Sequence, residues 1–253
     1  MSYALLIRHA QNDWVAKNRL AGWTPGVHLN DTGRSQAEKL AGRLEHVPLK
    51  AIYSSPLERC IETATAITAV HSLEIQHVEA MGEVRYGKWE GKKVKKLSKK
   101  PAWFTLQHYP SRFRFPGGES LVAVQYRAVQ AIEELAARHK DEMFAIVSHA
   151  DVIKLALAHY MGMHIDLFQR LVISTASVSL LALPESGTVR VVRVNDHGPI
   201  DLPPKPKEID KTDHGTNHRT KTGEEHPEIG VPISDGSALA KTEAISETEE
   251  MTE

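Results

Sequence analysis

The chain has little cysteine and lacks any long apolar run. Cys60 is the only cysteine among 253 residues, so an internal disulfide is excluded and secretion is not favoured. No segment approaches the roughly 20 apolar residues that span a bilayer. Arg8 interrupts the first apolar segment before it reaches the length of a signal peptide. We therefore expect a cytoplasmic protein with no membrane partner.

Aromatic residues are absent beyond Phe168. Residues 203–253 start with a proline-rich stretch and carry 12 acidic against 6 basic side chains. Without large apolar side chains, such a segment cannot offset the conformational entropy that ordering costs. We expect residues 1–202 to form one folded domain and residues 203–253 to be a disordered acidic tail.

The chain as a whole has no excess of positive charge, because its formal net charge is −1. A nucleic-acid partner is therefore not expected. The average hides a basic segment, residues 83–119, with ten basic side chains against three glutamates. Most of these lysines are expected on a solvated face, and a basic rim of this kind raises the local concentration of anions.

Two hydrophobic periodicities alternate along the first 202 residues. Short apolar runs predict strands at residues 3–7, 51–54, 73–78, 143–147, 178–183 and 189–194, the last two as a hairpin-like pair. Apolar residues on one helical face predict helices at residues 32–44, from Pro56 to about residue 70, from Ser120 to about residue 139, and at residues 152–161. Asn30 and Ser120 are the expected N-caps. The alternation indicates an α/β three-layer sandwich with helices on both faces of the sheet.

Three polar clusters directly follow predicted strands, where layered α/β folds usually bind ligands. They are Arg8-His9-Ala10-Gln11-Asn12, Ser54-Ser55-Pro56-Leu57-Glu58-Arg59 and Ser148-His149-Ala150. Each cluster alone is a weak signal. Together they bring two arginines and two histidines to one edge of a sheet, where guanidinium groups can clamp a phosphoryl group and imidazoles can supply a nucleophile and a donor.

In order and spacing, these clusters resemble the motifs of the histidine phosphatase superfamily, also called the phosphoglycerate mutase-like family. The resemblance runs from about residue 4 to residue 195 and its motifs are jointly specific. The matching elements are Arg8-His9-Ala10, Gly33-Arg34-Ser35-Gln36-Ala37, Ser55-Pro56-Leu57-Glu58-Arg59 with Thr63-Ala64, Glu83 with Gly87-Lys88-Trp89-Glu90-Gly91, Gly117-Gly118-Glu119-Ser120, and Ser148-His149-Ala150. The resemblance implies a phosphoglycerate mutase-like fold with a mostly parallel sheet, and makes residues 1–202 the catalytic domain.

The resemblance also implies a role for each of five residues. His9 is expected to attack phosphorus through its neutral imidazole and to form a phosphohistidine. Arg8, Arg59 and His149 are expected to bind the equatorial oxygens of the phosphoryl group. Glu83 is expected to protonate the leaving oxygen and then to deprotonate the attacking water, which requires a raised pKa.

The expected substrate contacts include four further residues. They are Gln11, Asn12, Thr24 and Ala150. Two departures from the family pattern bear on the substrate contacts. Ala10 and Ala150 stand where the family has glycine, so the backbone is expected to differ there, because alanine tolerates positive φ poorly. Val15 stands where the family often has a phosphate-contacting asparagine, and Asn12 is the candidate to supply that amide instead.

Three functions remain open on the sequence. The first is a phosphomonoesterase that acts on a small phosphorylated metabolite without a metal or another cofactor, since no histidine pair shares ligand spacing with a carboxylate or with Cys60. The second is a phosphoglycerate mutase, although the segment of residues 83–119 is short and lacks the adjacent arginine pair of the bisphosphoglycerate-dependent mutases. The third is a non-catalytic protein that binds a phosphorylated ligand. Neither the substrate nor the oligomeric state follows from the sequence.

Overall fold

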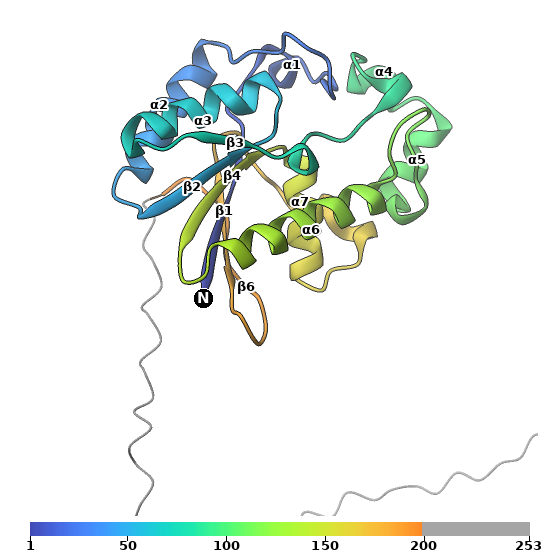
Figure 1. Cartoon of the computed structure of the whole chain (residues 1–253). Coiled ribbons are helices and arrows are strands. Elements are labelled where there is room, and N and C mark those ends of the chain that lie inside the picture. Colours follow the sequence, from blue (N-terminus) through green and yellow to red (C-terminus); the bar gives the residue numbers. More distant parts are fainter. Residues whose placement is uncertain (199–253) are drawn as a thin grey trace, which may run out of the picture. The chain divides into compact units, whose positions relative to one another are not determined.

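The computed structural model describes residues 1–198, which contain a six-stranded central sheet (Figure 1). In spatial order the strands are β3 (Ile75–His77), β2 (Leu49–Ser54), β4 (Met143–Ser148), β1 (Ser2–Arg8), β5 (Val178–Leu183) and β6 (Arg190–Asp196). Strands β1 to β4 pair in parallel, whereas β5 pairs antiparallel with both β1 and β6. The expected mostly parallel sheet is confirmed. The expected boundary at residue 202 and the tail of residues 203–253 lie outside the described residues.

Four helices occur where the apolar periodicity predicts them. They are α2 (Asp31–Leu44), α3 (Glu58–His71), α6 (Leu121–Arg138) and α7 (Ala150–Tyr160). Asn30 and Ser120 cap α2 and α6, because their side-chain oxygens accept a hydrogen bond from the backbone N–H of the third residue of each helix. Helix α3 starts after Pro56 and not at it. The preceding residues form a bend in which the Leu57 N–H donates to Ser55 Oγ over 3.4 Å.

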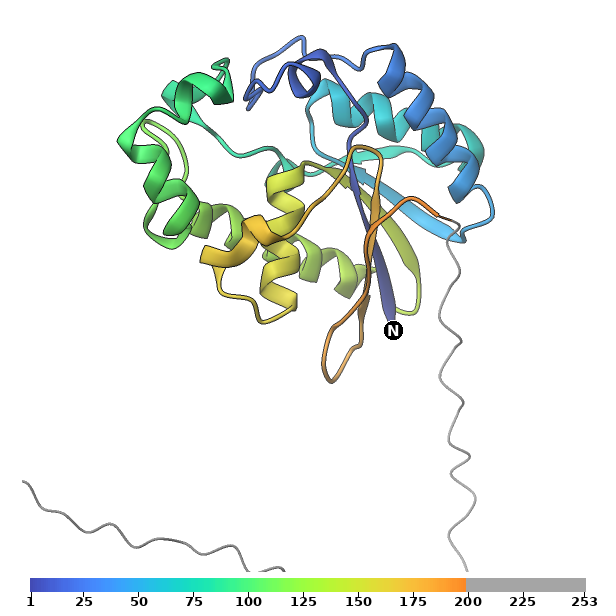
Figure 2. The same cartoon turned by 180° about the vertical axis from the view of Figure 1, so that it is seen from behind.

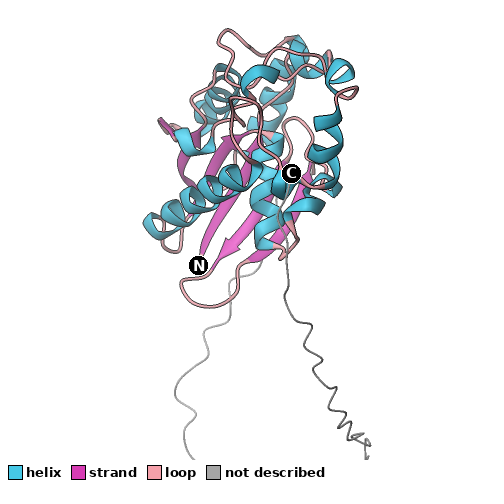
Figure 3. Cartoon of the chain, turned by 90° about the vertical axis from the view of Figure 1, so that its right-hand side faces the viewer, coloured by secondary structure: helices cyan, strands magenta, loops and turns pink. Residues whose placement is uncertain are grey.

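The sheet is the middle of three layers (Figure 3). Helices α2 and α3 pack on one face and α6 and α7 on the other, as Figure 1 also shows. Successive side chains of a strand point to opposite faces. In β1, Leu5 and Ile7 therefore join the core under α2 and α3, whereas Ala4 and Leu6 join the core under α6 and α7. The three-layer α/β class predicted from the sequence is confirmed.

Short helices lie in the segments that connect the strands and long helices. They are α1 (Asp13–Ala16), η1 (Glu79–Met81), η2 (Gly87–Trp89), α4 (Val94–Leu97), α5 (Pro101–His108), η3 (Pro110–Arg112) and η4 (Ile165–Arg170). The loop after α1 and the segment before α4 lie side by side (Figures 1 and 2). Backbone hydrogen bonds join Leu20 to Lys92 over 3.1 Å and Val94 to Asn18 over 2.9 Å. These bonds close one side of a cavity above the strand ends.

The register of the sheet brings the three polar clusters together. Arg8 at the end of β1 lies opposite Ser148 at the end of β4. Ser54 at the end of β2 lies opposite Val147 of β4. Because these three strands are parallel neighbours, the residues that follow them emerge at the same edge of the sheet.

Candidate active site

His9 follows β1 and is buried, with 3% of its surface exposed. Its Nδ1 atom lies 2.7 Å from the backbone oxygen of Ala10. A carbonyl oxygen only accepts hydrogen bonds, so Nδ1 carries the proton and the lone pair is on Nε2. Burial, assisted by the charges of Arg59 and Arg8, lowers the pKa of His9 well below its ordinary value. The imidazole is therefore neutral near pH 7, which is the form that a nucleophile needs.

Three buried donors beside His9 have no partner among residues 1–198. Arg8 Nη1 donates to the Ile173 carbonyl over 2.7 Å, and Arg59 Nη2 donates to the Gly22 carbonyl over 3.0 Å. Buried Arg8 Nε, Arg59 Nη1 and Asn12 Nδ2 bond to no other residue in the part of the chain that the structure describes. Buried polar groups are nearly always paired. Since Arg8, Arg59 and Asn12 line one cavity, we interpret the free donors as the binding atoms for an anion.

The side-chain oxygen of Asn12 caps a helix, which leaves its amide nitrogen without a partner among residues 1–198. Its Oδ1 atom accepts hydrogen bonds from the backbone N–H groups of Trp14 at 3.0 Å and Val15 at 2.9 Å. Asn12 is thus the N-cap of α1. The cap fixes the side-chain amide, so only Nδ2 is left for a ligand.

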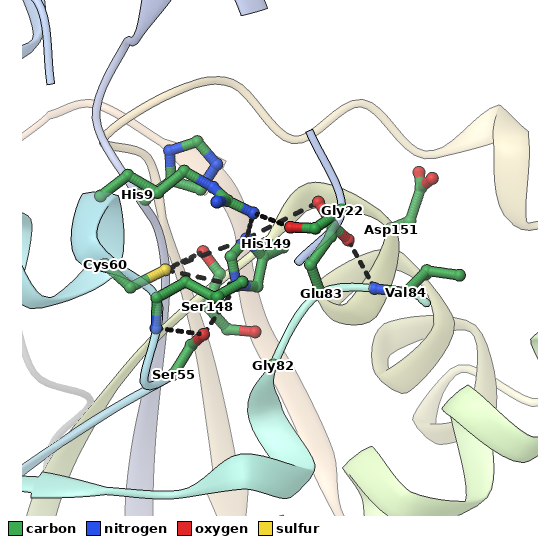
Figure 4. Close-up of polar contacts among 12 residues, drawn as sticks. His9, Gly22, Ser55, Cys60, Gly82, Glu83, Val84, Ser148, His149 and Asp151 are labelled. Carbon is green, nitrogen blue, oxygen red and sulfur yellow. Dashed lines mark hydrogen bonds and ion pairs between the residues drawn. The ribbon is translucent and has the colours of Figure 1, made fainter. Parts of the chain in front are cut away.

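His149 follows β4 and is completely buried next to His9, with the two ring centres 5.2 Å apart (Figure 4). Its Nδ1 accepts a hydrogen bond from Arg59 Nη2 over 3.2 Å, and its Nε2 lies 2.8 Å from Ser55 Oγ. Burial and the charge of Arg59 lower the pKa of His149 well below its ordinary value. Both histidines of the site are therefore neutral.

Cys60 lies next to His149, with its sulfur 3.4 Å from His149 Nε2 (Figure 4). Its side chain is completely buried. Burial raises the pKa of the Cys60 thiol to about 12. The thiol therefore stays protonated and is a packing group, because only a thiolate is a good nucleophile.

Glu83 lies in the irregular segment between η1 and η2, and its side chain is only 13% exposed. Its Oε1 accepts a hydrogen bond from the Val84 N–H over 3.0 Å, and its Oε2 lies 3.6 Å from His149 Nδ1 (Figure 4). Burial and the negative charge of Asp151 raise the pKa of Glu83 to about 7, although Arg59 and Arg8 oppose the change. A carboxyl with this pKa can both give and take a proton near neutrality.

The cavity that these residues line has a volume of about 420 Å³. The part of its wall that is formed by His9, Arg8, Arg59, Asn12 and Glu83 is here called its inner end. The remaining wall combines apolar side chains with polar groups, among them Asp151, Lys154 and Gln169. The arrangement offers a neutral nucleophile, unpaired cationic donors and an acid–base carboxyl within a space that suits a small molecule.

Comparison with known proteins agrees with this geometry. The sequence profile of the histidine phosphatase superfamily, branch 1, matches residues 4–197. The chain belongs to this superfamily. The resemblance seen in the motifs is confirmed, and so is the expectation of an enzyme of the phosphatase type.

Similar proteins of the superfamily carry more than one activity in their names. Phosphoserine phosphatase 1 of Hydrogenobacter thermophilus is 31% identical over 76% of this chain and 90% of its own length. A 2,3-bisphosphoglycerate-dependent phosphoglycerate mutase of Thermoplasma acidophilum is 27% identical over 72% of this chain and 87% of its own length. Among solved structures, Bacillus stearothermophilus YhfR superimposes with a TM-score of 0.74 at 29% identity, covering 79% of this chain and all of that one.

The histidine phosphatase motifs contribute unequally to the cavity. His9, Arg8, Arg59, His149, Glu83, Asn12 and Ala150 come together at or beside its inner end. Neither Ala10 nor Ala150 is among the non-glycine residues with positive φ in the described part of the chain, so alanine meets no backbone conflict there. The roles assigned to all these residues stay predictions.

Gln11 and Thr24 lie outside the lining of this cavity. The Gln11 side chain accepts a hydrogen bond from Asn30 Nδ2 over 3.1 Å, and its backbone N–H donates to Gln36. These two hydrogen bonds join Gln11 to the N-cap and to the first half of α2. A Cβ at Gly33 would lie 1.9 Å from the Gln11 carbonyl oxygen, so the close approach of the helix requires glycine there. Thr24 closes a turn through its N–H and the Ala21 carbonyl. Their expected substrate contacts stay predictions without a geometric basis.

Six polar residues of the cavity wall were missed from the sequence: Asn18, Arg19, Tyr86, Asp151, Lys154 and Gln169. Asp151 had a usable signal, because it follows His149 by two residues in the first turn of α7. Its carboxylate accepts from the Tyr86 hydroxyl over 3.3 Å and from Lys154 Nζ over 3.4 Å. Gln169 comes from a distant 3₁₀ helix and had no signal in the sequence pattern.

Two features are absent from residues 1–198. No helix in this part of the chain is long and apolar enough to cross a membrane. No group of three or more histidine, cysteine, aspartate or glutamate side chains in it is arranged to hold a metal ion.

Proposed function

We propose that the chain is a metal-independent phosphomonoesterase that hydrolyses a small phosphorylated metabolite through a phosphohistidine on His9. One observation carries the proposal. The bond from His9 Nδ1 to the Ala10 carbonyl leaves the Nε2 lone pair free among donors that lack partners within residues 1–198. Arg8 and Arg59 supply the positive charge that a transferring phosphoryl group requires.

In the first step, the Nε2 lone pair of His9 attacks phosphorus and the bond from phosphorus to the ester oxygen breaks. The protonated carboxyl of Glu83 donates its proton to that oxygen, and a neutral alcohol leaves. Arg8, Arg59 and Asn12 hold the equatorial oxygens. For His149 to donate to the phosphoryl group from Nδ1, Arg59 Nη2 has to give up its bond to that atom, and the Ser55 hydroxyl has to donate to Nε2.

In the second step, the Glu83 carboxylate removes a proton from water, and the water oxygen attacks phosphorus. The bond from phosphorus to Nε2 breaks and its electron pair returns to His9. Inorganic phosphate leaves, and Glu83 is again protonated. One group with a pKa of about 7 can serve both steps, because it is present in useful amounts in both forms near neutrality.

The experiment is a hydrolysis screen over a panel of phosphomonoesters, in the presence of EDTA, with a His9→Ala variant. We expect hydrolysis by the parent chain and a loss of at least about 1000-fold in kcat/KM for His9→Ala, because the covalent route is lost. Rapid quenching with a ³²P-labelled ester should trap a base-stable, acid-labile phosphoenzyme in the parent only. His46→Ala, on the exposed surface, is the matched control.

Two results of this experiment would reject the proposal. One is an absence of turnover across the panel although inorganic phosphate binds, which favours a non-catalytic binding protein. The other is a His9→Ala variant as active as the parent. Isomerisation of 3-phosphoglycerate that depends on bisphosphoglycerate would favour the mutase, for which the Thermoplasma acidophilum relative is the supporting observation.

A further inference from the structure

Glu83 follows η1 in a segment without regular secondary structure. Side chains of other elements nevertheless form hydrogen bonds to the backbone of η1 and of this segment. The carbonyl groups of four consecutive residues, Ala80, Met81, Gly82 and Glu83, each accept a hydrogen bond from a side chain of another element. Ser148 Oγ donates to Met81 over 2.6 Å, and Trp23 Nε1 donates to Glu83 over 2.6 Å. Such a density of side-chain bonds to a loop backbone needs a reason beyond stability, because most connecting segments lie free on the surface.

Arg127, in α6, supplies the other bonds to these carbonyls. Its Nη1 donates to Ala80 and, over 2.9 Å, to Gly82, and its Nη2 donates to Glu83 over 3.1 Å. The remaining two N–H groups bind the carboxylate of Glu119, at 3.0 Å from Nε and 3.1 Å from Nη2. All five donors of the guanidinium are therefore used. A lysine has neither the number nor the planar arrangement of these donors.

Glu119 fixes the other end of the same segment. Its Oε2 accepts from the Arg85 N–H over 2.9 Å, and its own N–H donates to the Arg85 carbonyl over 2.9 Å. A Cβ at Gly118 would lie 2.1 Å from the Arg85 oxygen, so the chain can come this close only with glycine. The Gly117-Gly118-Glu119-Ser120 motif contributes nothing to the cavity lining, but it brings Glu119 against the Glu83 segment.

We propose that Arg127 and Glu119 are positioning residues that hold residues 80–85 and thereby place the Glu83 carboxyl for proton transfer. Neither residue lines the catalytic cavity. Their effect reaches Glu83 because its carbonyl is tied to Arg127 and Trp23, while its Oε1 is tied to the next backbone N–H. The inference rests on the proposed function, since it assigns a cause to the placement of the proposed acid–base group.

The test uses the full chain with Arg127→Lys and Glu119→Gln, with Glu83→Gln as the reference and Arg138→Lys, at the exposed end of the same helix, as the matched control. Two esters separate the steps. An alkyl phosphate needs a proton on its leaving oxygen, whereas 2,4-dinitrophenyl phosphate does not. With the second ester, phosphoenzyme formation is read as a rapid burst of dinitrophenolate, and the slower steady state reports attack by water.

General acid–base catalysis contributes about 100-fold or more, so Glu83→Gln should lose at least that in kcat with the alkyl ester. For Arg127→Lys we expect roughly 30-fold, because a displacement near 1 Å costs on the order of 100-fold. Glu119→Gln keeps its shape and should lose about 5-fold. In all three variants the burst rate with 2,4-dinitrophenyl phosphate and the inhibition constant of inorganic phosphate should stay within about 3-fold of the parent.

A purely structural role predicts a different outcome, in which burst amplitude and phosphate affinity fall together with turnover. That result overturns the inference, and so does an Arg127→Lys variant that keeps its kcat with the alkyl ester. If Arg127→Lys does not fold, Glu119→Gln alone decides between these outcomes. A parent chain without a burst or hydrolysis, or a Glu83→Gln variant without loss, instead overturns the proposed function, so the two failures are distinguishable.

Discussion

Arg8, His9 and Arg59 line the inner end of the cavity, whereas the seven lysines of residues 88–100, here called the rim lysines, are exposed on the segment that contributes Val94 to the cavity wall. The inner groups come from strand ends and from the second residue of α3, where regular structure fixes their positions. The rim is built from a 3₁₀ turn, the short helix α4 and the loops beside them. Salt bridges occur for Lys17, Lys140 and Lys154, but in the described part of the chain none occurs for the rim lysines.

This contrast separates two uses of positive charge. Buried donors act over hydrogen-bond distances, where water and salt screen them little, and their effect depends on geometry. Exposed ammonium groups act through a field that salt screens over about 8–10 Å. The inner end should therefore govern binding of the phosphoryl group and the chemical steps, and the rim should govern the rate of encounter with anionic substrates.

Among the variants that test this contrast, the largest effect is expected where the buried geometry is disturbed, in Arg59→Lys. The forked donors are lost, and each hydrogen bond to a charged group contributes roughly 10- to 100-fold in affinity. We expect the inhibition constant of inorganic phosphate to rise by about that factor. The decrease of kcat/KM with added salt should keep its parental slope. A parental phosphate affinity would contradict this use of Arg59, and Arg34→Lys, on the exposed side of α2, is the control.

An intermediate effect is expected from pH, through Glu83. The acid form of Glu83 must be present for the first step. Its pKa of about 7 therefore predicts that kcat/KM is constant below pH 7 and falls about tenfold per pH unit above pH 7. His9 stays neutral well below pH 6.5, so no acid limb is expected from it near neutrality. Because Asp151 raises the pKa of Glu83, Asp151→Asn should move the falling limb to lower pH. An unmoved limb would assign the titration to another group.

The smallest effect is expected at the rim, in the double variant Lys95→Gln and Lys96→Gln. Loss of two screened charges should lower kcat/KM about 3-fold at low salt and leave kcat unchanged. The difference from the parent should vanish near 0.5 M salt, because the screening length then falls to about 4 Å. Lys39→Gln with Lys50→Gln is the matched control, because both lysines are exposed and neither lines the cavity. A 3-fold loss that persists at high salt would mean that these lysines contact the substrate.

The inner end could be predicted from the sequence because its signals are local. Polar residues that directly follow short apolar runs mark strand ends, and parallel pairing then brings Arg8, Arg59 and His149 together. The N-caps Asn30 and Ser120 were likewise visible as single residues before a periodic segment. Gln11 shows the limit of this reasoning: it is next to the site in the chain, but its side chain bonds to Asn30, away from the cavity.

The surroundings of Glu83 could not be predicted in the same way. Arg127 lies on a helix with an ordinary amphipathic pattern, and its five bonds reach residues 8 to 47 positions away in the chain. Helices α4 and α5 also escaped prediction, because the lysine-rich stretch before Pro101 has no clear apolar period. Such features depend on packing between distant segments, which a single sequence does not display.

The burial of Cys60 next to His149 makes the chain's sole thiol a natural reporter of opening. A protonated, inaccessible sulfur reacts with alkylating agents only in molecules that have exposed it, so the labelling rate measures the population of opened chains. A ligand that binds the closed state reduces that population in proportion to its occupancy. Cys60 takes no part in the proposed chemistry, and its labelling rate can therefore report how often the structure around His149 opens.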